Sequence, residues 1–252
     1  MLSRILEHKK TEIQNYQKPD DEKLPKRSFY EALKNPNRKL GLIAEVKKAS
    51  PSKGIIKEDF FPAVHAKQYE AGGADCLSVL TDSAFFKGAN HYLSEAKRET
   101  ALPVLRKDFI LDHLQVEESG LIGADAILLI GEALDPALLA ELFAHAAELG
   151  MDALVEVHSV PVLEKILKQI TPDLIGINNR DLATFQTDIK KAGEFKGYIP
   201  DGALLVSESG IHSPSDLELV RSHGADAVLV GESLMRQSNQ EAAVRELFGV
   251  QG

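Results

Sequence analysis

Residues 123–130, GADAILLI, form the clearest copy of a short pattern that recurs along this chain. A glycine, one further residue and an aspartate lead into a short, largely apolar run, and the same order appears at 73–80, 150–157 and 224–230. Glycine ends a helix easily because it tolerates a positive φ, and aspartate suits the turn that follows. Continuous rather than alternating apolar runs are typical of strands covered on both faces, so the pattern predicts a parallel sheet.

Eight short runs rich in Val, Ile and Leu are predicted to be strands: 42–46, 76–80, 103–105, 126–130, 153–157, 174–177, 203–206 and 227–230. Segments with helical periodicity, such as 136–147, separate most of them. Eight strand–helix units in 252 residues predict an α/β fold, a (β/α)8 TIM barrel, as one domain over residues 1–252. A doubly wound sheet is the main alternative, but no G-x-G-x-x-G motif follows the first strand, which argues against its dinucleotide-binding form.

Residues 1–40 precede the first predicted strand and are expected to form an N-terminal helical extension. Leu2, Ile5, Leu6 and Ile13 give a helical stripe, and residues 28–31 (SFYE) fit a capping box that opens a second short helix. Two interpretations stay open. The extension is a plug over one barrel end, or it helps to cover the active site, and the two are compatible.

Composition excludes several classes of protein. No apolar run approaches the ~18–20 residues that span a bilayer, so we expect no membrane partner, and the N-terminus lacks the pattern of a secretory signal. The single cysteine, Cys76, lies in an apolar run, which favours a core position and a reducing, cytoplasmic location. The net charge, 29 − 38 = −9, argues against a nucleic-acid partner.

Polar residues gather where five of the predicted strands end, which is where barrel enzymes place their active sites. They are Glu45 and Lys47, Lys107, Glu156, Asn178 and Arg180, and Glu208. Side chains alternate along a strand, so Glu45 and Lys47 should point the same way, into the barrel. Lys48, Arg106 and Asp181 are expected to serve packing or salt bridges. His158 has no second histidine or paired carboxylates at a ligand spacing, so no metal site is predicted.

Glycines in the last two loops predict a phosphate pocket. Gly210 follows the seventh predicted strand and leads to the helix start at 213–216 (SPSD), and Gly231 follows the eighth. Bare backbone N–H groups and a helix N-terminus favour anions, and this is the usual phosphate position in barrels that bind one.

Five segments together resemble the indole-3-glycerol-phosphate synthase family: EVKKASPSKG (45–54), LRKDF (105–109), EVH (156–158), GINNRDL (176–182) and SESGI (207–211). The resemblance covers essentially the whole chain, including the N-terminal extension. It implies a carboxy-lyase of tryptophan biosynthesis that needs no cofactor. Its small-molecule phosphorylated substrate, 1-(2-carboxyphenylamino)-1-deoxy-D-ribulose 5-phosphate, is closed to an indole with loss of carbon dioxide and water.

The resemblance also implies roles for residues. Lys107 would protonate the ketone oxygen during ring closure, and Glu156 and Lys47, the latter paired with Glu45, are the candidates for the dehydration. Substrate contacts would come from Arg180 on the anthranilate carboxylate, from Asn178, Glu208 and Ser50, and from apolar walls at Phe86, Phe109, Leu128 and Leu182. Phosphate would bind Ser209, Gly210, Gly231 and the backbone of Glu232, with help from Lys53. Glu232 departs from family members that have a small hydroxyl residue there, so its carboxylate must turn away from the phosphate.

Three rival functions stay open at this point. A phosphoribosylanthranilate isomerase would use a thiol–carboxylate or paired-carboxylate couple, but Cys76 starts its strand at the wrong barrel end. A Schiff-base aldolase would form an imine on a lysine, and an inactive barrel would serve as a scaffold. The length leaves no room for a second barrel, so we expect a monofunctional chain, a monomer with a homodimer as the alternative.

Overall fold

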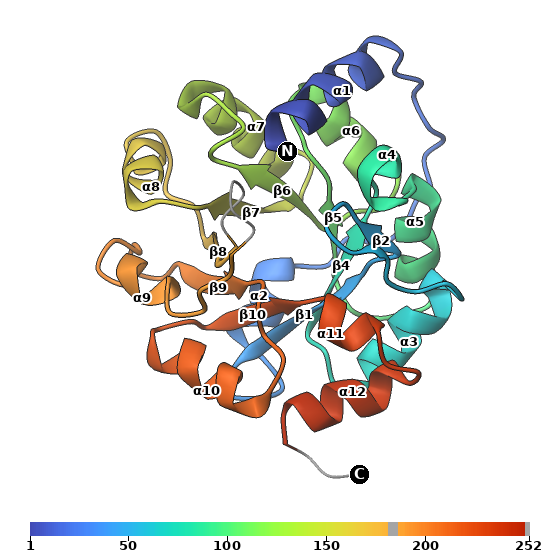
Figure 1. Ribbon diagram of the computed structural model, residues 1–252. Helices are drawn as coiled ribbons and strands as arrows, with labels where there is room; N and C mark the ends of the chain where they lie inside the picture. Colours follow the sequence, from blue (N-terminus) through green and yellow to red (C-terminus); the bar gives the residue numbers. More distant parts are fainter. Residues whose placement is uncertain (181–185, 250–252) are drawn as a thin grey trace.

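The computed structural model describes residues 1–180 and 186–249 as a closed barrel of parallel strands ringed by helices (Figure 1). The strands follow one another around the barrel as β1 (Gly41–Val46), β4 (Cys76–Leu80), β5 (Val104–Lys107), β6 (Ala126–Ile130), β7 (Asp152–Val157), β8 (Leu174–Asn178), β9 (Leu204–Glu208) and β10 (Ala227–Val230), and β10 pairs with β1. The longer outer helices are α3 (Pro62–Gly72), α5 (Asn90–Arg98), α6 (His113–Leu121), α7 (Pro136–Glu148), α8 (Val160–Leu167), α10 (Pro214–Ser222) and α12 (Gln240–Leu247). Short helices α4 (Ser83–Phe86), α9 (Ala192–Phe195) and α11 (Glu232–Met235) lie in the loops. The predicted TIM barrel is confirmed.

All eight predicted strands are present, with shifted ends. The third of them, β5, starts after Pro103, because proline has no N–H to donate to a neighbouring strand. It runs on to Lys107. A small antiparallel ladder, β2 (Ala49–Ser50) with β3 (Gly54–Ile55), was not predicted from the sequence. It folds the loop after β1 back on itself, above the barrel mouth.

The recurring glycine–aspartate pattern has a structural role at the barrel end where the strands begin. Its glycines all have positive φ angles, between 69° and 95°. Its aspartates accept backbone N–H groups from neighbouring segments: Asp125 from Val104 and Arg27, and Asp226 from Leu205. Each repeat therefore ties its strand to the start of the preceding strand or to the N-terminal extension, as expected for the end of a barrel that serves stability.

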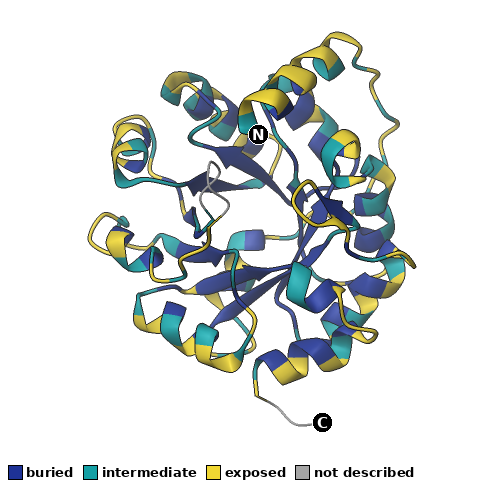
Figure 2. Ribbon diagram, in the orientation of Figure 1, coloured by how far each residue is buried: buried dark blue, intermediate teal, exposed yellow. Residues whose placement is uncertain are grey.

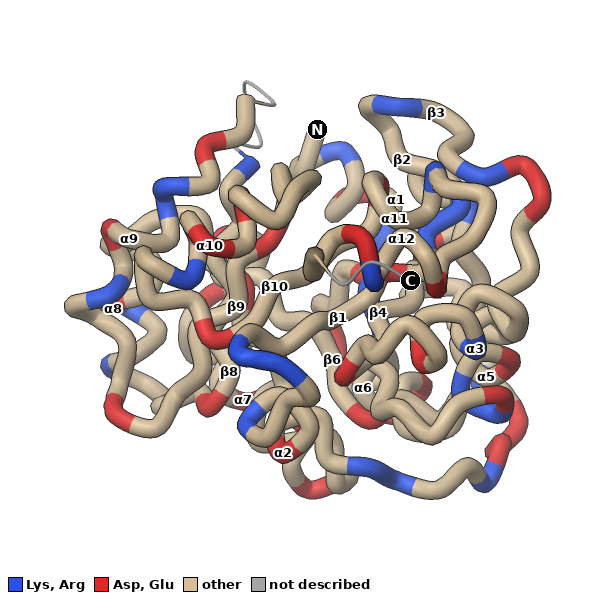
Figure 3. Tube along the Cα trace, turned by 90° about the horizontal axis from the view of Figure 1, so that it is seen from below, with Lys and Arg blue, Asp and Glu red and all other residues tan. Residues whose placement is uncertain are grey.

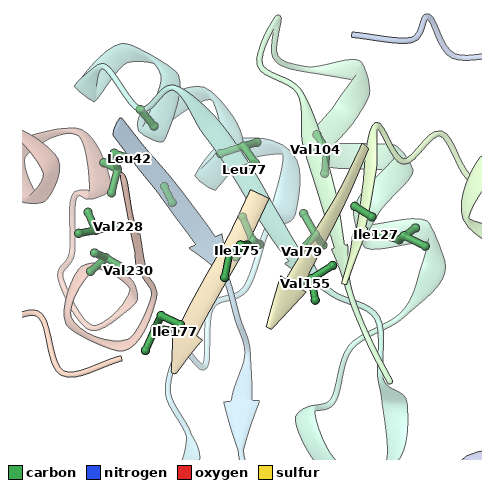
Figure 4. Packing of buried hydrophobic residues seen from close by; sticks show 14 of the residues in the cluster. Leu42, Leu77, Val79, Val104, Ile127, Val155, Ile175, Ile177, Val228 and Val230 are labelled. Atoms are coloured by element: carbon green, nitrogen blue, oxygen red, sulfur yellow. The ribbon is translucent and has the colours of Figure 1, made fainter. Parts of the chain in front are cut away.

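Two hydrophobic layers share the strands. Side chains such as Leu42, Leu77, Val104 and Ile127 point outward and pack under the helices (Figure 4). The alternate residues, among them Ile43 and Leu105, fill the barrel interior. Buried strands inside a ring of half-exposed helices follow from this arrangement (Figure 2). In the described part of the chain, no helix is long and apolar enough to cross a bilayer, and the expected cytoplasmic location remains a prediction.

The N-terminal extension plugs one end of the barrel and reaches the other end, so the two interpretations of its sequence both hold. Its second helix, α2 (Phe29–Lys34), plugs the barrel where the strands begin, with Phe29 and Leu33 fully buried against the inner layer. Its first helix, α1 (Leu2–Gln14), lies near the opposite end, so the chain's N-terminus and α2 stand at opposite ends of the barrel (Figure 3). Cys76 lies under the α2 plug, with its thiol 3.7 Å from the carbonyl oxygen of Phe29, as the sequence predicted for a core cysteine.

Candidate active site

A pocket opens at the carboxyl ends of the strands, where the barrel fold places catalytic groups. Most of the predicted site residues line it: Glu45, Lys47, Ser50, Phe86, Lys107, Phe109, Leu128, Glu156, Asn178, Arg180, Glu208, Ser209, Gly210, Gly231 and Glu232. They come from all eight barrel strands and the loops that follow them. Strand alternation explains the position of four of them: Glu45, Lys107, Glu156 and Glu208 each lie two places after an inward apolar residue, which are Ile43, Leu105, Leu154 and Val206.

Lys107 stands at the centre of the pocket floor between two carboxylates. Its Nζ lies 2.8 Å from Oε2 of Glu156 on β7 and 3.2 Å from Oε2 of Glu208 on β9. The amide of Asn178 donates to the other Glu156 oxygen at 3.0 Å. Both carboxylates are more than nine-tenths buried, and a buried charge is tolerated only when it is paired and hydrogen-bonded.

The buried ion pairs move the pKa values of the three groups apart. Burial opposes the charge on Lys107, but the carboxylates of Glu156, Glu208 and Glu45 outweigh it and raise the lysine pKa. Burial also opposes the charge on Glu156, yet the ammonium of Lys107 holds the pKa of that carboxyl below its usual range. Burial, with the neighbouring Glu156 charge, raises the pKa of Glu208 to about 7 despite the attraction of Lys107. The pocket floor therefore holds Lys107 as a cation, Glu156 as an anion, and Glu208 as a carboxyl group whose pKa lies near neutrality.

A second ion pair, Lys47 with Glu45, comes from β1 and its end, and both residues point into the barrel as predicted. Gly231, which follows β10, leaves the room for it: a Cβ there would overlap the carboxylate of Glu45 and lie 3.0 Å from Nζ of Lys47. The glycine predicted for phosphate therefore also makes space for the Glu45–Lys47 pair.

Arg180 reaches the rim of the same pocket. Its backbone N–H donates to Oδ1 of Asn178 at 3.0 Å, and its Nη1 lies 3.4 Å from Oγ of Ser52 in the loop after β1. Nε of Arg180 is buried and has no hydrogen-bond partner among the described residues. The guanidinium is thus positioned with donors still available to an anion in the pocket.

The two loops expected to bind phosphate lie side by side at the pocket edge. Ser209 and Gly210 have φ angles of 72° and 82°, and Gly231 precedes the short helix α11. The carboxylate of Glu232 is drawn aside by Arg236, with oxygen–nitrogen distances of 3.0 and 3.1 Å, as its position beside a phosphate would require. Lys53 is half exposed and is not among the residues that line the pocket; its Nζ lies 3.9 Å from Glu232.

The expected apolar walls are present in part. Phe86 and Phe109 are in contact, with ring centroids 6.1 Å apart, and both line the pocket together with Leu128. Leu182 lies outside the described residues, as does Asp181. Arg106 is buried and bonded to Asp108 and Glu118, so the prediction of a structural role for it is confirmed.

Sequence reasoning left open that the N-terminal extension covers the site, but it did not predict the role of Lys9 on α1. Met1, Leu2 and Ile5 line the pocket, and Lys9 is buried with its Nζ 3.0 Å from Asp82 and 2.9 Å from Asp108. The signal was present in the sequence: Lys9 falls four residues after Ile5 and four before Ile13, on the apolar stripe of the helix. A lysine on that face must find carboxylates beneath it.

Comparison with protein families gives a match over nearly the whole chain. Residues 2–247 match the model of the family described as indole-3-glycerol phosphate synthase. A protein of that name from Bacillus velezensis is 59% identical over 249 residues, 99% of this chain and 100% of that protein. Another from Bacillus licheniformis is 57% identical over 252 residues, and one from Halalkalibacterium halodurans is 50% identical over 249 residues; these matches cover 100% and 99% of this chain and 100% and 97% of the respective relatives.

Solved structures support the fold alone. A mandelate oxidase aligns with a TM-score of 0.63 at 16% identity, covering 85% of this chain and 73% of that one. A thiamine phosphate pyrophosphorylase from Pyrococcus furiosus aligns with a TM-score of 0.61 at 16% identity, covering 84% and 95%.

Proposed function

This chain belongs to the indole-3-glycerol phosphate synthase family, and from that membership we propose how the residues of its pocket divide the work. The chain converts 1-(2-carboxyphenylamino)-1-deoxy-D-ribulose 5-phosphate to indole-3-glycerol phosphate, with loss of carbon dioxide and water, as a step of tryptophan biosynthesis. The reaction needs a proton for the ketone oxygen, a path for carbon dioxide to leave, and an acid and a base for the dehydration.

Lys107 is the proposed acid of ring closure. The ring carbon that bears the carboxylate attacks the ketone carbon, and the electron pair of the C=O bond moves onto oxygen. An ammonium on the pocket floor stabilises that charge and protonates it. The observation that carries this proposal is the position of Lys107 between Glu156 and Glu208, which holds the lysine as an ammonium in a buried pocket.

Glu156 and Lys47 are the proposed base and acid of the dehydration. Loss of carbon dioxide restores the aromatic ring, and the hydroxyl left by ring closure then departs. Glu156 takes a proton from the carbon next to nitrogen, the C–H electron pair forms the new double bond, and Lys47 protonates the departing hydroxyl as water. Glu45 holds Lys47 in place through their ion pair.

The substrate has two anionic groups, a carboxylate and a phosphate, and a different part of the pocket is proposed to bind each. Arg180, next to Asn178 and Ser52, is the proposed partner of the anthranilate carboxylate. Its planar guanidinium can donate two parallel N–H groups to a carboxylate. Ser50, which lines the same wall, is the proposed contact from the loop after β1. The backbone of Ser209, Gly210, Gly231 and Glu232 is the proposed phosphate cradle, with Lys53 approaching from outside. Phe86, Phe109 and Leu128 are the proposed walls for the aromatic ring.

The test is to incubate the purified chain with the carboxyphenylamino-deoxyribulose phosphate, without metal or nucleotide, and to identify the product. Indole-3-glycerol phosphate formed by the chain and lost in Lys107→Ala supports the proposed assignment. Undiminished turnover in Lys107→Ala would remove the lysine from the chemistry.

A further inference from the structure

His158 lies behind the proposed base, outside the substrate pocket. It follows β7 directly, two residues after Glu156, and its Nε2 is 3.2 Å from Oε1 of Glu156. The other oxygen of Glu156 holds Lys107 at 2.8 Å. Glu156 is therefore placed between two groups that can carry a positive charge, one of which contacts the pocket. His158 is not among the described residues that line it.

The surroundings of His158 favour the imidazolium form. Its backbone N–H donates to Oε1 of Glu132 at 2.8 Å, which brings a second carboxylate near the ring. Burial opposes the charge, and so does Lys191, but the carboxylates of Glu156 and Glu132 outweigh them and raise the pKa of His158. The side chain is only 11% exposed, so water screens these interactions weakly.

In the proposed chemistry, Glu156 could become protonated between ring closure and dehydration. While Lys107 is an ammonium, it keeps the buried carboxylate of Glu156 ionised. Once Lys107 has given its proton to the ketone oxygen, that charge is gone, and burial together with nearby carboxyl groups favours a protonated Glu156. A protonated Glu156 is too weak a base to accept the hydrogen that dehydration must remove.

We propose that His158, as imidazolium, supplies the second positive charge that keeps Glu156 ionised after Lys107 has donated its proton. The inference rests on the proposed roles of Lys107 and Glu156 and adds a positioning residue that touches no substrate atom. No proton passes through His158: Glu156 accepts the proton from carbon, and Lys47 delivers one to the departing hydroxyl. The imidazolium acts only on the dehydration, because ring closure takes place while Lys107 still carries its charge.

Step-resolved single turnover tests this. Carbon dioxide leaves before the dehydration and the indole chromophore appears after it, so the two signals separate the stages. In His158→Asn, which keeps a donor but cannot be charged, carbon dioxide should appear at the unmodified rate. The indole signal should appear roughly ten- to a hundredfold more slowly, the range expected for losing an ion pair whose charge shifts the pKa of Glu156 by about one to two units. His113→Asn, at a half-exposed histidine of α6, is the matched control and should leave both rates unchanged.

Each other outcome overturns the inference. Equal slowing of both signals would mean that His158 supports the whole site, and unchanged rates would mean that its charge is not used. His158→Gln repeats the test with a longer amide if the asparagine variant does not fold. Glu156→Gln, run in parallel, tests the proposed role of Glu156 on which the inference rests. If this variant also forms indole without a delay relative to carbon dioxide release, the proposed role of Glu156 is wrong. If only the His158 variants fail to do so, the inference alone falls.

Discussion

The carboxylate of Glu208 occupies the space that a side chain at Gly176 would fill, because a Cβ added to Gly176 would overlap Oε1 of Glu208. Gly176 and Glu208 lie on neighbouring strands, and both belong to the layer that faces the barrel interior. The glycine thus decides where the Glu208 carboxylate stands, and through it how Lys107 is held at 3.2 Å.

Gly176→Ala should therefore reduce activity more than stability. The obstructed atom is the end of a flexible side chain, so the carboxylate moves and the backbone stays. A displacement of about 1 Å at a catalytic group can cost about a hundredfold in rate. Gly41→Ala is the control: its Cβ would meet Ala227 and Leu33 at 3.2 Å in the opposite end of the barrel. That variant should lower the melting temperature with kcat unchanged, and the reverse pattern between the two variants would contradict the prediction.

Lys9→Met should loosen α1 from the barrel. The change leaves Asp82 and Asp108 as buried carboxylates without their ammonium partner, and breaking such a pair typically costs about 3–5 kcal/mol in the free energy of unfolding. Because Met1, Leu2 and Ile5 line the pocket, KM should rise as well. Urea unfolding and steady-state kinetics check both effects, with Lys10→Met, on the exposed face of the same helix, as the control. Unchanged stability in Lys9→Met would show that α1 does not depend on this pair.

Ring closure should slow as the pH rises through about 7. Below that pH Glu208 is neutral, because burial raises its pKa to about 7. Above it, the ionised carboxylate holds the Lys107 proton more tightly and makes the lysine a weaker acid. A change of one to three units in acid strength, only partly felt in the transition state, corresponds to roughly three- to thirtyfold in rate. The rate of carbon dioxide release in single turnover reports this step, and Glu208→Gln should flatten its pH profile. A profile in that variant identical to the unmodified one would assign the titration to another group.

The barrel could be predicted because its signals are local. The runs of Val, Ile and Leu and the glycines with positive φ depend on neighbours in the sequence, and all eight strands appeared where they were expected. Strand alternation also placed Glu45 and Lys47 on the same inward face. The ends of the strands were predicted less accurately: the third strand was expected at 103–105, whereas β5 runs from Val104 to Lys107 because Pro103 has no N–H to donate and the pairing continues beyond Leu105.

Distances between side chains on different strands of the barrel could not be predicted from the sequence. Nothing in the order of residues says that Lys107 lies closer to Glu156 than to Glu208, or that Gly231 leaves room for Glu45. Lys107 is 49 positions from Glu156 and 101 from Glu208, while Glu45 lies on the first strand of the barrel and Gly231 directly follows the last. Such relations follow from the register of the closed sheet. The placement of α1 over the pocket is of the same kind, because it depends on Lys9 meeting two buried aspartates.

Arg180→Lys should be poorly tolerated. If the guanidinium holds the substrate's carboxylate with two parallel N–H donors, an ammonium cannot reproduce that geometry. A loss of about 2–5 kcal/mol in transition-state binding is the range for one member of such a charged pair, measured as the change in kcat/KM. Arg221→Lys, whose arginine pairs with Glu218 on the surface of α10, is the control. A near-normal kcat/KM in Arg180→Lys would mean that the carboxylate is held elsewhere.

Lys107→Ala should fold and bind substrate but turn over far more slowly. The two carboxylates that it leaves can share a proton, because Glu208 already titrates near neutral pH. Removal of a general acid typically costs on the order of 10²–10⁴ in rate. Binding is checked by fluorescence titration and turnover by indole formation. A loss confined to KM, with kcat intact, would make Lys107 a binding group only.

The same variant would lose activity under an imine mechanism, so its kinetics alone do not identify the chemistry. An imine requires an uncharged amine to attack the ketone, and the carboxylates of Glu156 and Glu208 hold Lys107 in the opposite state, as an ammonium. Borohydride added during turnover should therefore leave the protein's mass unchanged, because no C=N bond exists for it to reduce. A stable adduct mapped to Lys107 by peptide mass would refute the acid role. It would also mean that the lysine loses its proton before ring closure, against the charge arrangement of the pocket floor.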